Sequence, residues 1–237
     1  VSSTKGNMDA FESDAFASTR SILTTELQLA HPPVIISNAC ISGVLAINIA
    51  ADYIQTKRFS DVFIIGIDAV SDFVLYGFQS LFALSDGPCK PFDKHRTGTS
   101  LGEACGIVHL SNKATKKAVE YLGGTSSNDA NHISGPSRTG EGLFRAINRA
   151  VQQSKIQLTD IDFISAHGTG TIFNDEMESI AFGRLGLENV PVNSMKGYFG
   201  HTLGAAGVIE TIMTIVSMQE NTLFESLGFT EQGTSQA

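Results

Sequence analysis

The sequence has few basic residues, few cysteines and no long apolar run, and each shortage excludes a class of protein. Its 237 residues include 16 Lys and Arg against 24 Asp and Glu, which gives a formal net charge of −8. General nucleic-acid binding needs a basic surface to replace phosphate counterions, so this charge argues against it. Gly, Asn, Ser or a charged residue interrupts each apolar stretch within a few residues, and we therefore expect no membrane span.

The three cysteines, Cys40, Cys89 and Cys105, form no Cys-x-x-Cys motif, and their odd number prevents complete pairing. This usage is typical of a reducing compartment, so we expect thiols in a cytoplasmic protein. The length suits one large domain or two small ones, and the hydrophobic content of 42% is ample for a core. Because the chain begins with Val1 rather than Met and ends in a polar stretch, we expect both ends to be cuts within a longer protein.

Strand patterns alternate with helix patterns, which predicts an α/β domain with layered sheets. The apolar run at 61–68 is typical of a strand covered on both faces. The helix at 141–154 carries its apolar residues on one stripe. Strands are expected at 34–36, 61–68, 106–110, 161–166 and 190–193, and helices at 42–55, 141–154, 175–185 and 203–218.

Cys40 is a candidate nucleophile because it lies between a predicted strand and the start of a predicted helix. Unpaired backbone N–H groups and the helix dipole at such a position favour the thiolate, which is the reactive form of cysteine. The alternative is a buried, inert thiol, the commoner fate of a lone cysteine. Cys89, in a Pro-flanked loop, and Cys105, next to a strand, lack this setting and are expected to be structural.

Two of the six histidines follow predicted strands in glycine-rich turns. His167 begins the run His-Gly-Thr-Gly-Thr, in which glycines let the backbone approach a ligand and Thr169 and Thr171 add hydroxyl groups. His201 lies within the segment 194–207, and ligands gather at the carboxyl ends of strands in such sheets. One site could therefore hold Cys40, His167 and His201. The remaining histidines are expected to be packing or surface residues: His31, His95, His109 and His132.

Four charged residues lie near these motifs: Asp175, Glu178, Lys196 and Glu210. The ordinary expectation for each is a solvated helix face. Glu210, however, lies in an otherwise apolar helix, where an unpaired carboxylate is costly. We therefore expect Lys196 to pair with Glu210, and this pair could also tune a neighbouring imidazole.

Several motifs together resemble the β-ketoacyl-acyl carrier protein synthase family, the condensing enzymes of fatty acid and polyketide synthesis. The resemblance runs from about residue 3 to residue 218. It rests on Asn38-Ala39-Cys40 before a helix, Lys90-Pro91-Phe92-Asp93 with Arg96, Gly98, Gly102 and Glu103, His-Gly-Thr-Gly-Thr at 167–171, and Lys196 through Gly207. Any one of these motifs alone is a weak signal, but their shared order and spacing are specific.

The resemblance implies a thiolase-like fold, with α-β-α-β-α layers and two similar halves at about 1–110 and 111–237 within a single domain spanning 1–237. It also implies a homodimer, or a heterodimer with a related ketosynthase, in which the strand at 61–68 pairs across the dimer. The family's upstream βαβ portion and its C-terminal Gly-Phe-Gly-Gly loop are not matched here. We therefore expect a partial domain.

By the same resemblance the protein is an acyltransferase whose Cys40 accepts an acyl chain from an acyl carrier protein as a thioester. His167 and His201 then bind the malonyl thioester carbonyl, promote decarboxylation and stabilise the enolate that attacks the acyl-Cys. A thiolate nucleophile and N–H donors for a developing oxyanion suit this chemistry. Substrates arrive on the phosphopantetheine of the carrier, and no metal or redox cofactor is required.

Other positions carry supporting roles in the resemblance. Lys196 and Glu210 match the family's ion pair, and Thr169 and Thr171 match residues that touch the phosphopantetheine arm. Three aromatic residues are candidates for an acyl channel, although core packing is the ordinary role of each: Phe78, Phe82 and Phe199.

Rival interpretations remain. A thiolase needs a second catalytic Cys towards the C-terminus, and no Cys follows Cys105 in this sequence. A coenzyme A-primed condensing enzyme has Asn at the position of His201. An α/β-hydrolase needs glycines on both sides of its nucleophile, which Asn38-Ala39-Cys40-Ile41-Ser42 lacks. A non-catalytic or incomplete partner subunit that dimerises and shapes chain length stays open, although such partners usually lack the active Cys.

Overall fold

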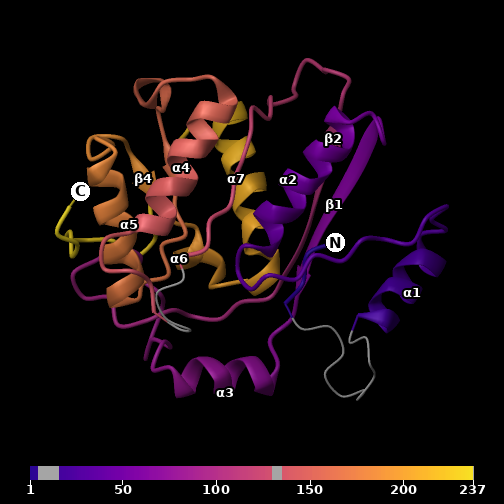
Figure 1. The fold of residues 1–237 in the computed structure, drawn as a ribbon. Coiled ribbons are helices and arrows are strands. Elements are labelled where there is room, and N and C mark those ends of the chain that lie inside the picture. Colours follow the sequence, from indigo (N-terminus) through magenta and orange to yellow (C-terminus); the bar gives the residue numbers. More distant parts are fainter. Residues whose placement is uncertain (5–15, 130–134, 237) are drawn as a thin grey trace. The chain divides into compact units, whose positions relative to one another are not determined.

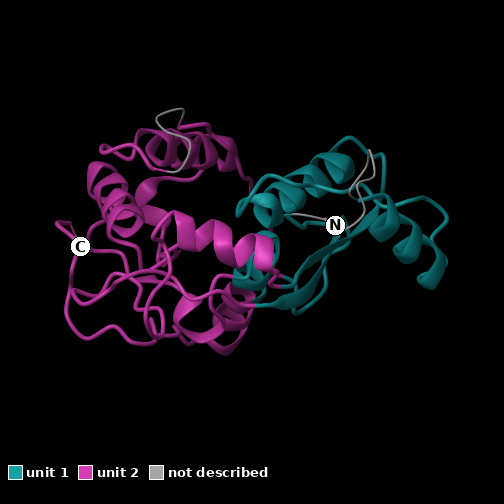
Figure 2. Cartoon of the chain, turned by 90° about the horizontal axis from the view of Figure 1, so that it is seen from below, with its two compact units in different colours: residues 1–69, 103–118, 202–212 teal, residues 70–102, 119–201, 213–237 magenta. Residues whose placement is uncertain are grey.

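The computed structural model describes residues 1–4, 16–129 and 135–236, so His132 lies outside the described residues (Figure 1). The chain divides into two compact units (Figure 2). Unit 1 comprises residues 1–69, 103–118 and 202–212, and unit 2 comprises residues 70–102, 119–201 and 213–237. Each unit is therefore assembled from three separate stretches of sequence. The expected halves at about 1–110 and 111–237 stay a prediction.

Unit 1 is built on an antiparallel pair of strands, β1 (Asp61–Asp68) and β2 (Ala104–Ser111). Helix α2 (Ser42–Gln55) packs along this pair (Figure 1). Ile64 is buried, whereas Phe63 and Ile67 on the opposite face of β1 are 65% and 39% exposed. The expectation of a strand covered on both faces is therefore wrong for the described residues, because alternate side chains of a strand point to opposite faces.

The strand β1 has neighbours on both of its edges. One edge of β1 pairs with β2. On the other edge, the backbone of Ser2 forms hydrogen bonds with Ile65 and Ile67, and Ser2 also forms a β-bridge with Ile36. Ser2 occupies this edge only at residues 65–67, and the expected pairing of 61–68 across a dimer stays a prediction.

The start of helix α7 (Ala206–Glu220) fixes the start of α2 within unit 1. A Cβ on Gly207 would lie 2.6 Å from the backbone nitrogen of Val44, and one on Gly43 would lie 2.7 Å from that of Val208. Only glycine permits such an approach of two backbones. Gly207, within the small-residue cluster at 204–207, thus serves close packing of the two helix starts.

Unit 2 holds a short parallel pair, β3 (Ile164–Ser165) and β4 (Val192–Asn193). Helices α4 (Glu141–Ser154) and α5 (Ile172–Arg184) pack together beside it. The remaining elements of the unit are α3 (Asp72–Ser80), the 3₁₀ turn η1 (Leu158–Asp160) and α6 (Lys196–Phe199). Its core consists of Ala166, Phe182, Leu185 and Leu187, against which the apolar stripe of α4 packs.

Most predicted elements are confirmed. The strand expected at 34–36 is wrong, because only Ile36 forms an isolated bridge, to Ser2, and most other differences concern length. Helices 42–55 and 141–154 and strand 61–68 have the predicted bounds. The strand expected at 161–166 is reduced to two residues, and the helix expected from 203 begins as the 3₁₀ turn η2 (Leu203–Ala205). Helices α1 (Ala17–Glu26) and α3 were not predicted. In the described part of the chain, no helix is long and apolar enough to cross a membrane.

Candidate active site

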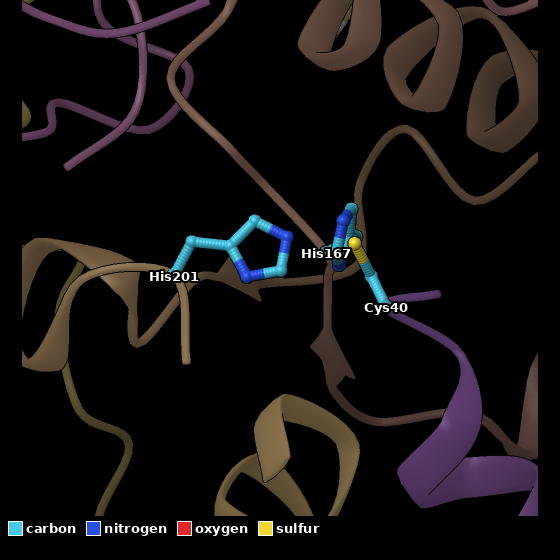
Figure 3. A group of neighbouring side chains, drawn as sticks. All are labelled: Cys40, His167 and His201. Atoms are coloured by element: carbon cyan, nitrogen blue, oxygen red, sulfur yellow. The ribbon is translucent and has the colours of Figure 1, made fainter. Parts of the chain in front are cut away.

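Cys40 stands in unit 1 immediately before the first turn of α2 (Figure 3). The preceding residue, Ala39, has a φ of 45°, a left-handed conformation that is costly for a residue with a side chain. The fully buried hydroxyl of Ser42 accepts from the backbone nitrogen of Asn38 at 2.7 Å and donates to the Ala39 carbonyl at 2.6 Å. One hydroxyl group therefore stabilises the strained turn, which leaves the Cys40 side chain half-buried at the helix N-terminus.

The other two cysteines differ from Cys40. Cys89 is buried in unit 2, where its thiol donates to the Thr169 carbonyl at 3.1 Å and burial raises its pKa. Cys105 is exposed on β2, and no disulfide joins any of the three. These surroundings agree with the expected structural role of Cys89.

His167 follows β3 in unit 2 and is fixed by a buried lysine. Lys196 Nζ lies 3.1 Å from His167 Nδ1 and donates to the His167 carbonyl at 2.5 Å, while the Lys196 side chain is only 2% exposed. An ammonium group can only donate, so Nδ1 accepts and the ring proton belongs on Nε2. This contact selects one imidazole tautomer. It also shows that the solvated face expected for Lys196 is wrong.

His201 is held by its backbone. Its N–H donates to the Ser100 carbonyl at 2.6 Å, and its own carbonyl accepts from Gly102 at 3.1 Å. Any Cβ on Gly102 would collide with the Phe199 carbonyl, so this close approach requires glycine. The His201 ring lies edge-to-face against Phe78 at 5.9 Å and is 1% exposed.

The two imidazoles form a neighbouring pair within unit 2. Their ring centroids are 5.1 Å apart and their planes are nearly perpendicular, at 85° (Figure 3). Burial, the charge of Lys196 and His201 hold the pKa of His167 well below its ordinary value. Burial and Lys196 lower the pKa of His201 to about 3. Both rings are therefore neutral near pH 7, and each can donate an N–H to an oxygen that gains negative charge.

Two carboxylates of α5 accept hydrogen bonds from the backbone of the His-Gly-Thr-Gly-Thr loop. Glu178 accepts from the backbone nitrogens of His167 at 2.8 Å and Gly168 at 2.7 Å, and Asp175 accepts from that of Gly170 at 3.1 Å. Asp175 is fully buried and Glu178 is 3% exposed, so the solvated helix face expected for both is wrong. Burial and the neighbouring Asp175 raise the pKa of Glu178 to about 7, although the two N–H donors offset part of this effect. Burial likewise raises the pKa of Asp175.

The Lys-Pro-Phe-Asp motif connects this loop to the end of the chain. The backbone nitrogen of Phe92 donates to Asp175 at 2.8 Å, and Arg96 Nε lies 3.8 Å from the same carboxylate. Asp93 accepts from the backbone nitrogens of His95 at 2.7 Å and Thr230 at 2.6 Å. Burial alone would raise the pKa of Asp93, but these donors hold it well below its usual range. The motif is thus a structural anchor of unit 2.

The other predicted site residues have mixed surroundings. The hydroxyls of Thr169 and Thr171 lie 2.9 Å apart at the His167 loop. Phe78 contacts His201, whereas Phe199 is 42% and Phe82 92% exposed. Glu210 is half-buried in the unit 1 part of α7, and its expected pairing with Lys196 stays a prediction.

Comparisons with known proteins agree with this geometry. Residues 3–116 match the profile of the β-ketoacyl synthase N-terminal domain, and residues 118–230 match that of the C-terminal domain. The chain belongs to the β-ketoacyl synthase family. It is 34% identical over 212 residues to 3-oxoacyl-[acyl-carrier-protein] synthase 2 of Rhizobium meliloti, covering 82% of this chain and 50% of that relative. The chain spans about half the length of the curated relatives it matches.

Solved structures of β-ketoacyl synthases share the fold. A β-ketoacyl synthase from Burkholderia phymatum STM815 has a TM-score of 0.84 at 30% identity, covering 94% of this chain and 58% of that one. A ketosynthase (ApeO) in complex with its chain length factor (ApeC) from Xenorhabdus doucetiae has a TM-score of 0.82 at 32% identity, covering 91% and 56%. The thiolase-like fold expected from the motifs is confirmed.

Reasoning from the sequence did not identify what the α5 carboxylates do in this chain. Asp175 and Glu178 lie three residues apart, so they share one helix face, and that face follows a loop rich in glycine and backbone N–H donors. A short acidic pair directly after such a loop is the signal that could have indicated them. Their burial depends on contacts with residues far away in the sequence, such as Phe92.

Proposed function

We propose that this protein is a condensing acyltransferase that uses thioesters carried on an acyl carrier protein. In the first step the Cys40 thiolate attacks the acyl thioester, so that the acyl group moves to Sγ and the carrier thiol leaves. In the second step a malonyl thioester loses CO₂, and the resulting enolate carbon attacks the acyl-Cys40 carbonyl. This step releases the Cys40 thiolate and gives a β-ketoacyl thioester.

The observation that carries the proposal is the pair of neutral imidazoles in unit 2. Loss of CO₂ places negative charge on the thioester oxygen, and N–H donors in a dry environment stabilise such charge. His167 is suited to this role because Lys196 occupies its Nδ1 and leaves the proton on Nε2. His201, with its pKa lowered to about 3, stays a neutral donor over the whole physiological range.

Cys40 is proposed as the nucleophile because its position combines a strained turn with a helix N-terminus. A thioester intermediate divides the condensation into two easier steps. Thr169 and Thr171 are proposed to contact the phosphopantetheine arm. Phe78 and Phe199 are proposed to line the acyl channel, and Glu210 to pair with Lys196.

The proposed partners are an acyl carrier protein and a second ketosynthase-like subunit. Titles of solved relatives describe a ketosynthase with its chain length factor and a ketosynthase with an acyl carrier protein. A cytoplasmic location is also part of the proposal, although some relatives are named mitochondrial or chloroplastic. Fatty acid and polyketide synthesis are both represented among the relatives' names.

Intact-protein mass spectrometry with acyl-carrier and malonyl-carrier substrates tests the two steps separately. Replacement of Cys40 by Ala should abolish acylation. Cys105 is an exposed thiol on β2, and its replacement by Ala should leave acylation unchanged. Replacement of His201 by Ala should permit acylation of Cys40 but block condensation. If His201→Ala condensed at the normal rate, the division of labour would be wrong.

Iodoacetamide labelling separates the enzyme from a non-catalytic partner subunit that shapes chain length. Cys105 is more exposed than Cys40, so accessibility alone would label Cys105 first. An activated thiol reverses this order, because the thiolate is the reacting species. Faster labelling of Cys40 supports the enzyme, and labelling in order of exposure supports the partner subunit.

A further inference from the structure

Unit 1 contains an apolar pocket that the proposed condensation does not use. Its volume is about 390 Å³, which lies within the range of small-molecule sites, roughly 300–1,000 Å³. The pocket opens between one side of α2, the segment 27–36 and strand β1. Its walls include Pro33, Val34, Ile49, Ala50, Tyr53 and Phe59.

A cationic group is fixed beside two walls of this pocket. After α2 ends, Lys57 adopts a φ of 58°, and the chain folds back so that the Tyr53 carbonyl accepts from Arg58 at 2.9 Å and Phe59 at 3.2 Å. This turn places the Arg58 guanidinium 4.7 Å from the centre of the Tyr53 ring and 5.7 Å from that of Phe59. The side chain is thereby ordered before any ligand arrives.

The charge of Arg58 is not neutralised by the part of the chain that the structure describes. Among these residues no carboxylate lies within 4.0 Å of its guanidinium, whereas Arg145 and Arg184 both pair with Glu141. The guanidinium can therefore offer its planar donors to an external anion. A carboxylate matches this fork with two parallel hydrogen bonds and a single negative charge.

We propose that unit 1 binds a fatty carboxylate, with its hydrocarbon chain in the apolar pocket and its head group on Arg58. Apolar walls favour the chain by removing it from water, and the cation that lies over the wall residues Tyr53 and Phe59 selects an anionic head. His31, whose ring lies edge-on to Phe59 at 6.4 Å, supplies a further polar group beside that wall residue.

This site is distinct from the proposed acyl-Cys40 site. Arg58 follows the last turn of α2, and Cys40 precedes the first. A helix of 14 residues extends about 20 Å at 1.5 Å per residue. The head-group position at Arg58 therefore lies at the opposite end of α2 from the proposed nucleophile, while the apolar walls extend back along α2 to Ala46. The site does not depend on the proposed function.

Calorimetric titration of the protein with dodecanoate and with uncharged dodecanol tests the proposal. Replacement of Arg58 by Gln should weaken dodecanoate binding by about tenfold or more, the worth of one charge-assisted pair, without changing dodecanol binding. Val34→Asp, at a wall position that is 51% exposed, should weaken both ligands. Lys113→Gln, an exposed cation of unit 1 away from the pocket walls, is the matched control and should change neither.

Photolabelling with a dodecanoate that carries an alkyl diazirine locates the bound chain. Crosslinks at residues 27–36, 49–53 or 59–65 support the site. Crosslinks confined to unit 2 overturn it, as does an Arg58→Gln variant that binds dodecanoate normally. Absence of any dodecanoate binding, for example because another protein segment fills the pocket, also overturns it.

Discussion

The Cys40 turn and the His167 loop are supported in opposite ways. Backbone geometry dominates the Cys40 turn: a left-handed Ala39, one buried hydroxyl from Ser42 and a close glycine contact at Gly207. Buried charge dominates the His167 loop, where Lys196 holds the ring and Asp175 and Glu178 hold the backbone. A nucleophile needs an accessible position beside a helix dipole, whereas neutral imidazole donors need a dry setting and a fixed tautomer.

Replacement of Lys196 by Met should have the largest effect, because it removes the charge and the Nζ contact that determine the state of His167. We expect condensation to slow by about 10²–10³-fold, as for loss of one oxyanion donor, while acylation of Cys40 continues. The pKa of His167 should rise towards its ordinary value, which imidazole NMR measures. Lys116→Met, an exposed lysine of unit 1, serves as the control. An unchanged His167 titration would contradict the charge-based account of this loop.

Replacement of Glu178 by Gln tests the cost of the buried carboxylates. The pKa of Glu178 is raised from 4.5 to about 7, so the folded protein binds this proton more tightly than the unfolded chain does. The stability contributed by the protonated form is therefore complete below pH 4.5 and is lost as the pH rises through about 7. We expect the difference in unfolding free energy between wild type and variant to change by about 3 kcal/mol across this window.

Urea unfolding at several pH values between 4 and 8 measures that difference. Glu188→Gln, at an exposed position after α5, is the matched control for the loss of a carboxylate charge. A constant difference between wild type and Glu178→Gln at all pH values would mean that the carboxylate does not titrate in this window.

Replacement of Gly207 by Ala tests the glycine contact that fixes the start of α2. Because the new Cβ would lie 2.6 Å from the Val44 nitrogen, we expect a loss of about 1–3 kcal/mol of unfolding free energy. Gly77→Ala in α3, where a Cβ meets nothing within 4 Å, should instead be neutral or slightly stabilising. Equal effects of the two substitutions, measured by urea unfolding, would remove close packing as the explanation.

Replacement of Ser42 by Ala should have the smallest effect on stability. It leaves the Asn38 N–H without its acceptor, which costs about 1 kcal/mol. Because the hydroxyl also holds the Ala39 carbonyl, we expect the iodoacetamide labelling rate of Cys40 to change as well. Ser80→Ala, an exposed α3 hydroxyl that bonds only within its own helix, should leave this rate unchanged. A Cys40 rate unaffected by Ser42→Ala would show that the turn does not control the thiol.

Local sequence patterns correctly predicted the helices and strands whose apolar residues recur at a regular spacing. The apolar stripe of 141–154 and the apolar run of 61–68 gave the correct helix and strand because hydrophobic periodicity is a local property. The strand at 161–166 was predicted too long, since only Ile164 and Ser165 find a pairing partner in β4. Strand length depends on the neighbour, which a local pattern does not contain.

The candidate site divides in the same way. Cys40, His167 and His201 are recognisable from residue type, glycine-rich turns and motif order, all of which are written in the sequence. The tautomer of His167 and the lowered pKa of His201 cannot be recognised from the sequence. They follow from burial and from Lys196, which is 29 residues from His167. Asp175 and Glu178 look like surface residues until the chain folds backbone N–H groups onto them.

The sequence by itself determined the family and most of the helices and strands, and it indicated the candidate reactive side chains, because these depend on residue type and short-range spacing. Tertiary structure alone decided which charges are buried, which carbonyls and amides they hold, and that Arg58 lies over two aromatic rings beside an apolar pocket. Burial and electrostatic energy depend on distances in space, and a chain sets those distances only when it folds.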